Sequence, residues 1–281
     1  MRKPDFLPHF LMLLFAAPLV LLLSLSAFAQ NNSKAPSAAA DQKDDQKSEQ
    51  LINRAIEVYG GAAYLNVHTA IGRGFYTLFR DGVPQLPAKF VDYIVYPDKE
   101  RTEFTGGGTH LIQTNFGSEG WNFDGATKTI KDQKPEQIED FKFAVKTSID
   151  YLLRGNWRKE GAKLSYVGRR EAGLAKRNET IRLEYPDGFW IEYEFGARDG
   201  LPAKIIYMRK RKNADTGVIE EYNEEDRLQK PITIDGVTSA WVIDHFINTK
   251  QFSRIAYESV EYNKPVADSL FTKPTTVKGM K

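Results

Sequence analysis

The sequence predicts an α+β protein built mostly from antiparallel β-strands. Its clearest stretch, residues 179–209, holds two runs in which apolar and polar residues alternate, as in a strand with one buried face. Short turns at 186–188 and 196–200 separate these runs from each other and from a third, and such turns make neighbouring strands antiparallel. One helical pattern, at 135–154, interrupts the other strands.

The alternation assigns two faces to this three-stranded meander. One face is apolar and should lie on the core or concave side: Ile181, Leu183, Ile191, Tyr193 and Phe195. The other face is polar and should lie in water: Arg182, Glu184, Glu192 and Glu194. Glu192 and Glu194 could also mimic the carboxylate pair of a glycosidase, but charge is ordinary on the wet face of a strand.

The N-terminal residues have the features of a secretory signal peptide. Arg2 and Lys3 precede an apolar run, and residues 27–29 (Ala-Phe-Ala) form a cleavage site. We expect residues 1–29 to be removed after Ala29, which predicts a periplasmic protein. The alternative is an uncleaved membrane anchor, although the apolar run is shorter than the ~20 residues that span a bilayer.

The rest of the chain divides into a linker and one domain. Residues 30–47 contain almost nothing that could be buried, which predicts a disordered linker. Residues 48–281 are long enough for one domain. The chain has no cysteine, which excludes disulfides, thiol catalysis and zinc–thiolate sites. Its net charge of +2 is near neutral and does not favour nucleic acid as a partner.

Two helices are expected. The first begins at Ser48, a good N-cap, and ends at Gly60-Gly61. The second covers 135–154, with Pro135 in its first turn. Its apolar stripe consists of Ile138, Phe141, Val145, Ile149 and Leu152. Further apolar residues lie off that stripe, which is typical of a helix that covers something apolar.

Strands account for most of the remaining sequence. Period-two patterns and turn residues predict strands near 67–79, 90–96, 111–116, 121–123, 163–169, 178–185, 189–195, 203–210, 217–223, 237–248 and 252–262. Within 90–96, Asp92 is the exception to an otherwise apolar run. The basic residues 209–212 lie close to an acidic stretch, so we expect a hairpin with cross-strand ion pairs; a docking patch for an anionic headgroup is the alternative.

Few residues suggest chemistry. His68, His110 and His245 have no ligand partner at metal-binding spacing, so we predict no metal site, no cofactor and no catalytic residue. His245 shares a face with Trp241, and a satisfied core histidine is the expected interpretation.

Four short motifs resemble the LolA/LolB-like family of periplasmic lipoprotein carriers. They are residues 56–65 (IEVYGGAAYL), 117–121 (GSEGW), 198–202 (RDGLP) and 260–274 (VEYNKPVADSLFTKP). The resemblance implies a strongly curved open sheet, a half-barrel, with helices on its concave side. It also implies that acyl chains of a lipoprotein or lipid lie in that hollow, and that sorting components of the inner and outer membranes are partners. The arginine that ties the lid shut in LolA could correspond to Arg73 or Arg101.

The first functional hypothesis is therefore a monomeric, lipid-binding carrier or chaperone for acyl chains, in lipoprotein sorting and outer-membrane biogenesis. On this hypothesis, the apolar face of the meander, the helical stripe and Trp241 line the cavity, with the 135–154 helix as its lid. The alternative is an envelope sensor or assembly module that binds an acylated or unfolded partner without transport. A hydrolase is the third hypothesis, which a buried carboxylate or histidine pair in the cavity would favour.

Overall fold

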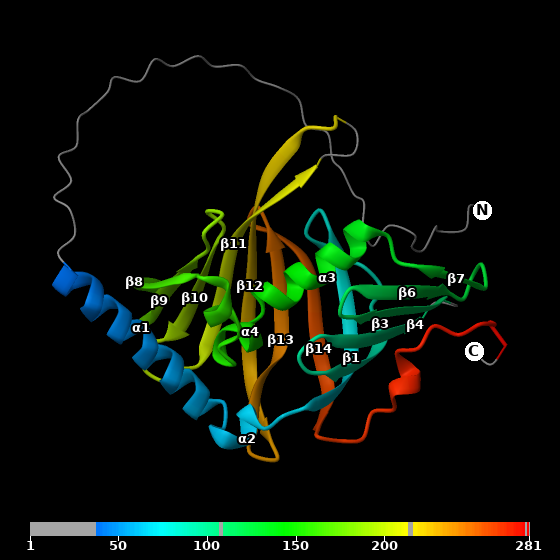
Figure 1. The fold of residues 1–281 in the computed structure, drawn as a ribbon, viewed down its shortest axis with the longest axis horizontal. Helices are drawn as coiled ribbons and strands as arrows, with labels where there is room; N and C mark the ends of the chain where they lie inside the picture. The colour runs from blue at the N-terminus through cyan, green and yellow to red at the C-terminus, as the bar shows by residue number, and fades with distance from the viewer. Residues whose placement is uncertain (1–37, 107–108, 213–215, 279, 281) are drawn as a thin grey trace.

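The computed structural model describes residues 38–106, 109–212, 216–278 and 280. The described residues form one antiparallel sheet of 14 strands with few helices (Figure 1). The predicted signal peptide and residues 30–37 of the predicted linker lie outside the described residues. Within them, no helix combines the length and the apolar character needed to cross a membrane.

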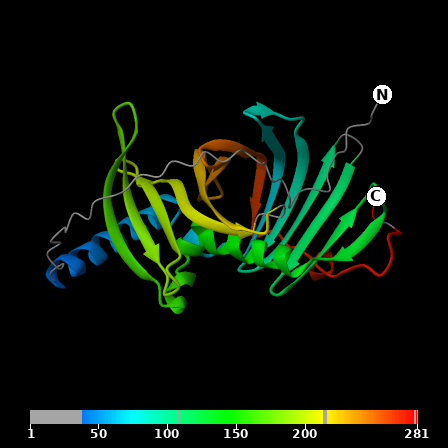
Figure 2. The same cartoon turned by 90° about the horizontal axis from the view of Figure 1, so that it is seen from above.

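The sheet is open, with β7 and β8 at its two edges, and its strand order is β7-β6-β5-β4-β3-β1-β14-β13-β12-β11-β10-β9-β8. Figure 2 shows that it is curved rather than flat. The strands are β1 (Thr69–Arg80), β2 (Val83–Pro84), β3 (Ala88–Val95), β4 (Lys99–Gly106), β5 (Thr109–Phe116), β6 (Glu119–Asp124), β7 (Thr129–Asp132), β8 (Lys163–Gly173), β9 (Lys176–Glu184), β10 (Trp190–Gly196), β11 (Pro202–Lys212), β12 (Ile219–Ile234), β13 (Val237–Ile247) and β14 (Lys250–Tyr262).

The helices are α1 (Ala38–Val58), α2 (Ala62–Leu65), α3 (Pro135–Thr147), α4 (Ile149–Leu153) and the short 3-10 helices η1 (Asn156–Glu160) and η2 (Asp268–Leu270). Helix α1 begins ten residues earlier than predicted, so Ser48 lies inside it, fully buried, and is not its N-cap. Residues 38–47 are rich in Ala, Gln and Lys, which favour helix without adding an apolar stripe. This part of the predicted linker is therefore helical.

The predicted meander is confirmed. Strands β9, β10 and β11 are neighbours, with Ile191 opposite Leu183 and Tyr193 opposite Ile181. The apolar face is buried completely, as predicted: Ile181, Leu183, Ile191, Tyr193 and Phe195 are each 0% exposed. These side chains pack against α1, α4 and η1 and form the main core.

The prediction for the opposite face of the meander is wrong at two positions. Glu192 and Glu194 are 3% and 2% exposed, not in water. The guanidinium groups of Arg170 and Arg182 lie on Glu192, each 2.6 Å from a carboxylate oxygen, and Asn178 donates to Glu194 at 2.9 Å. Long side chains from β8 and β9 thus cover the carboxylates, which a single-strand pattern cannot reveal.

The C-terminal segment packs on the face that is turned away from α3 (Figure 2). The indole of Trp121 donates to the carbonyl of Phe271 at 2.8 Å, and Arg101 donates to the carbonyl of Leu270 at 2.9 Å. Ile112, Trp121 and Phe123 form a second, smaller core beneath this segment.

Truncation of Leu183 tests the main core. Leu183→Ala should lower the free energy of unfolding by about 2–5 kcal/mol, because the side chain is fully buried. The same change at Leu174, which is 99% exposed, should have an effect below about 0.5 kcal/mol. Urea denaturation of both variants measures this, and equal midpoints would show that Leu183 is not in the core.

Glu192→Ala should also destabilise the protein, by about 1–3 kcal/mol. Burial raises the pKa of Glu192, but hydrogen bonds from Arg170 and Arg182 lower it more, so the net shift is downward. The Glu192 carboxylate therefore contributes its stabilisation of the folded state above the unfolded pKa of about 4.3. This stabilisation is lost as the pH falls through the folded pKa. Because both arginines are partly exposed, solvent screening keeps the effect moderate.

Urea denaturation of the Glu192→Ala variant and the wild type at neutral and acidic pH checks this expectation. Glu184→Ala, at an exposed position on the neighbouring strand, is the matched control and should be neutral. A difference between wild type and Glu192→Ala that does not shrink in acid would contradict the ion-pair explanation.

Candidate functional site

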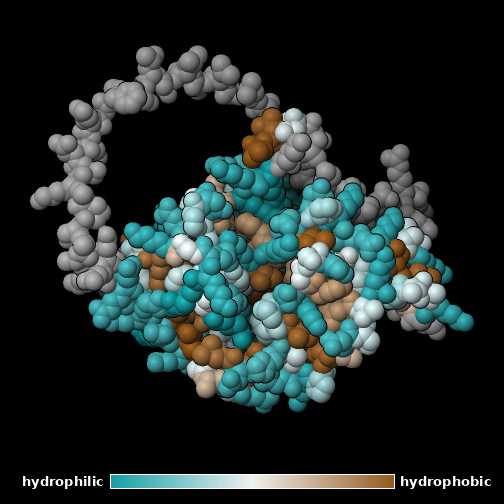
Figure 3. Space-filling model, viewed as in Figure 1, coloured by the Kyte–Doolittle hydropathy of each residue, from teal (hydrophilic) through white to brown (hydrophobic). Residues whose placement is uncertain are grey.

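Helices α3 and α4 connect the two edges of the sheet. Strands β7 and β8 are consecutive in the chain but lie at opposite edges, so the connection must cross one face (Figures 1 and 2). Figure 3 shows this face of the molecule, where apolar residues lie in patches among hydrophilic ones. The two helices therefore cover one face of the sheet.

The helix predicted at 135–154 is two helices, so that prediction needs a correction. The break is at Ser148, whose backbone is extended (φ −66°, ψ 155°). The Ser148 hydroxyl donates to the carbonyl of Val145 at 2.8 Å and accepts from the amide of Tyr151 at 3.1 Å. Because serine side chains compete with the helical backbone in this way, one helix ends and another begins here.

Helix α4 is an anchor. Leu152 and Leu153 are 0% and 3% exposed and belong to the main core. The carboxylate of Asp150 accepts from the Tyr64 hydroxyl at 2.6 Å and the Tyr96 hydroxyl at 3.2 Å. Arg154 donates to backbone carbonyls of α2 and of the loop that follows it, including that of residue 67 at 3.1 Å. These contacts fix α4 to the body of the protein.

Helix α3 is attached to the sheet more lightly. Its Asp140 is paired with Arg209 of β11. The ring of Phe143 lies 5.4 Å from that of Tyr207 and 5.3 Å from that of Phe189, between ring centroids. Within α3, only Phe141 and Thr147 are buried.

A cavity of about 260 Å³ lies on the other side of α3. Its lining comes from α3, α4, η1 and two turns of the sheet: Asp98, Gly117, Phe141, Lys142, Val145, Lys146, Tyr151 and Glu160. Ligand sites for small molecules are usually ~300–1,000 Å³. In this arrangement the cavity is too small for a long acyl chain, so loading one requires α3 to move.

The predicted cavity residues do not all meet in one cavity. Phe141 and Val145 line the cavity beside α3. Ile149 packs against the main core, while Ile138 and Trp241 are partly buried. The remaining predicted residues are filled core, packed against α1 and α4: Leu152, Ile181, Leu183, Ile191, Tyr193 and Phe195. Their role in ligand binding stays a prediction.

Neither arginine suggested for the lid lies near α3. Arg73 is paired with Glu261 at 2.5 Å, and Arg101 contacts Glu103 and the C-terminal segment on the opposite face. The strand arginine that holds α3 is Arg209. Its neighbours Lys210 and Arg211 pair with Glu221 and Glu224 of β12, at 3.3 and 2.9 Å, which confirms the cross-strand interpretation for those two residues.

His245 is satisfied by hydrogen bonding, as expected. Its Nδ1 lies 2.7 Å from Asp226 Oδ1. Burial lowers the pKa of His245, but the hydrogen bond and negative charge of Asp226 raise it more, and the net shift is upward. Among the described residues, no group of three or more His, Asp or Glu is arranged to hold a metal ion.

The feature that sequence reasoning missed is a pair of acids on the face of β3 and β4 that carries the helices. Asp92 is 8% exposed, and the Thr102 hydroxyl donates to it at 2.9 Å. Glu100 lies nearby on β4, 3.4 Å from the same hydroxyl. None of the ion pairs among the described residues includes either acid. Asp92 was visible as the polar exception within an apolar strand, but its partner was not.

Burial raises the pKa of Asp92 well above its usual value, and the neighbouring Glu100 raises it further. Burial likewise raises the pKa of Glu100. A carboxyl pair that acts as acid and base has environments that drive the two pKa values apart. Here both shift in the same direction, which does not favour the hydrolase hypothesis.

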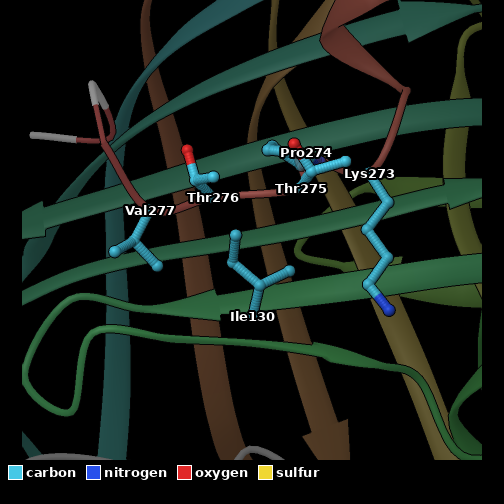
Figure 4. Close-up of a pocket in the computed structure, with 6 residues that line it drawn as sticks. All are labelled: Ile130, Lys273, Pro274, Thr275, Thr276 and Val277. Atoms are coloured by element: carbon cyan, nitrogen blue, oxygen red, sulfur yellow. The ribbon is translucent and has the colours of Figure 1, made fainter.

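A second cavity, of about 460 Å³, lies between the C-terminal segment and β7 (Figure 4). It is lined by Ile130 and residues 273–277. Ile130 packs with the smaller core, so this cavity is on the face away from α3. It therefore does not communicate with the residues predicted for ligand binding.

The described residues form an open, curved antiparallel sheet with a helical connection across one face (Figure 2), and proteins of known structure share this fold. No family model matches the sequence, and no curated protein matches it. A DUF1329 family protein from Desulfovibrio piger aligns with a TM-score of 0.53 at 11% identity, over 82% of this chain and 97% of that one. The LolA superfamily protein NE2245 from Nitrosomonas europaea aligns with a TM-score of 0.51 at 11% identity, over 80% and 97%. The resemblance inferred from the sequence is thus confirmed for the fold.

The raised pKa values predict an unusual pH dependence. The Asp92→Asn/Glu100→Gln variant should gain stability relative to the wild type as the pH rises. Acids whose pKa values are raised in the folded state make their full contribution to the free energy of unfolding below their unfolded pKa values of about 4. That contribution is lost as the pH rises through the pKa values of the folded state. Urea denaturation between about pH 4 and 8 measures the difference.

Glu119→Gln, at an exposed position on β6, is the matched control. A stability difference between the double variant and the wild type that is constant across this range would contradict the assignment of raised pKa values.

Proposed function

We propose that this protein is a periplasmic carrier that holds the acyl chains of a lipoprotein or lipid between α3 and the concave face of the sheet. The observation that carries the proposal is the contrast between the two bridging helices. Helix α4 is fixed in the core, whereas α3 is held mainly by the ion pairs of Asp140 and Lys146 and by one aromatic cluster, beside a cavity. A lid requires this combination of a fixed hinge and a weakly held cover.

A comparison of free energies supports the proposal. A chain of ~16 carbons offers about 12 kcal/mol on burial, at ~0.8 kcal/mol per methylene, before ordering costs. The side-chain contacts that hold α3 are individually weak, since an aromatic pair contributes about 0.5–1.5 kcal/mol and a partly exposed ion pair about 1 kcal/mol or less. A ligand can shift an equilibrium only by its differential affinity, so the carrier function requires that this affinity exceed the cost of opening.

Export supports the same function. The N-terminal sequence has the features of a cleaved signal peptide, which would place the carrier in the periplasm after cleavage behind Ala29. The neighbours of known structure share the fold at 11% identity, so the comparison supports the fold of this chain. The acyl cargo is our proposal.

Joining α3 to the sheet should block ligand uptake. The natural chain has no cysteine, so Asp140→Cys and Arg209→Cys introduce the only thiols. A short, reducible bifunctional thiol reagent can then connect the two positions, which are paired in the structure. Crosslinked protein should take up a fluorescent fatty acid at least about tenfold more slowly, because the open state is removed. Reducing agent should restore the rate.

Asp140→Cys alone, treated with the same reagent, is the control and should load normally. Normal uptake by the crosslinked double variant would mean that α3 is not a lid. A protein that loads the probe but does not release it to acceptor vesicles would be a binding module and not a carrier.

A further inference from the structure

The acid pair belongs to a longer row of hydrogen-bond acceptors on the same face. Asn115 of β5 lies directly opposite Glu100 of β4, and Gly120 of β6 lies opposite Asn115. The side chain of Gln133 covers Gly120, where a Cβ atom would be 2.7 Å from its amide oxygen. Residues paired across antiparallel strands project from the same face. The row therefore crosses four neighbouring strands.

Two amide oxygens in this row have no partner. Asn115 is 2% exposed and Gln133 is 6% exposed. In the described part of the chain, Asn115 Oδ1 and Gln133 Oε1 accept no hydrogen bond. The orientation of the Gln133 amide is fixed, because its nitrogen donates to the carbonyl of Thr114 and to Asn122 Oδ1, each at 3.2 Å. A buried acceptor without a donor costs free energy, which suggests that a ligand supplies the donor.

The nearby cations are engaged elsewhere. Lys142 and Lys146, which line the cavity beside α3, pair with Glu139 and Glu160 at 3.0 and 2.8 Å. No ion pair among the described residues neutralises Asp92 or Glu100. The titratable group Tyr257 also faces the pair: burial raises its pKa, and the negative charges of Asp92 and Glu100 raise it further.

The row lies close to the cavity. Asp98 and Gly117, which line the cavity, lie in the turns next to β4 and β5, each two residues from Glu100 or Asn115 and on the order of 7 Å away. Aromatic rings lie at the other end of the row. Phe90, two residues from Asp92 on the same face of β3, packs edge-on against Tyr257 with centroids 5.5 Å apart.

We propose that the acid end of this row, formed by Asp92, Glu100 and Asn115, binds an ammonium group, as the headgroup of the ligand whose chain lies under α3. An ammonium offers three donors and no acceptor, which complements two carboxyl groups without an ion pair and an amide oxygen without a donor in the described chain. The rings of Phe90 and Tyr257 add the electron-rich surface that cations prefer. The inference rests on the proposed carrier function, and it specifies the ligand as an amine-bearing amphiphile.

Calorimetric titration of the full-length mature protein with dodecylamine and dodecanol tests the proposal, because the two probes share one chain and differ in the headgroup. The wild type should bind dodecylamine about tenfold to a hundredfold more tightly, as expected for charge-assisted hydrogen bonds in a buried site. In Asp92→Asn/Glu100→Gln, which keeps the side-chain shapes, this preference should disappear. Glu103→Gln should retain it, because Glu103 lies on the opposite face of β4.

Equal affinity for the two probes, or a preference that survives the double variant, would overturn the ammonium site and leave the carrier function intact. If neither probe binds, the carrier function fails, and ethanolamine then decides the remaining question. Thermal stabilisation of the wild type but not of the double variant by ethanolamine would support an ammonium site for a free amine. No stabilisation of either protein would overturn it.

Discussion

The position of β7 and β8 at opposite edges of one sheet is the constraint from which the rest of the structure follows. Because these strands are consecutive in the chain, residues 133–162 must cross the whole sheet. A flat sheet of this many strands would be on the order of 60 Å wide, and α3 and α4 together span about 27 Å of that distance. The curvature of the sheet (Figure 2) brings its edges closer and shortens the path that the other connecting residues have to cover. The same curvature places α3 over a recess.

The face beneath the helices has two different halves. Along β8 to β11 it is solid apolar core, closed by α1 and α4. Along β3 to β7 it carries Asp92, Glu100, Asn115 and Gln133 and is bordered by the cavity beside α3. An amphiphile has the same division into an apolar and a polar part, so one molecule can satisfy both the apolar lid and the unpartnered acceptors.

On the opposite face of the sheet, the buried carboxylates are paired with arginines. Glu192 and Glu194 are buried under arginines that reach across from neighbouring strands. The carboxylates of this region are thus neutralised within the protein, whereas Asp92 and Glu100 are not. Asp92 is buried and Glu100 is partly buried, so the contrast depends on the presence of a cation. The arginines lower the pKa of Glu192, whereas burial without such a partner raises the pKa values of Asp92 and Glu100.

The sequence by itself determined the local features. Alternation and turn residues defined the β9–β10–β11 meander and its buried face, because period two is a property of one strand. Four short motifs indicated the fold. The tertiary structure decided which groups meet. The charged second half of β12, residues 224–234, was not predicted as a strand, because its pairing with β13 and not its composition makes it one. The break at Ser148, the burial of Glu192 and the row that joins Asp92 to Gln133 all depend on contacts between residues that are distant in the chain or on hydrogen bonds that a periodic pattern does not encode.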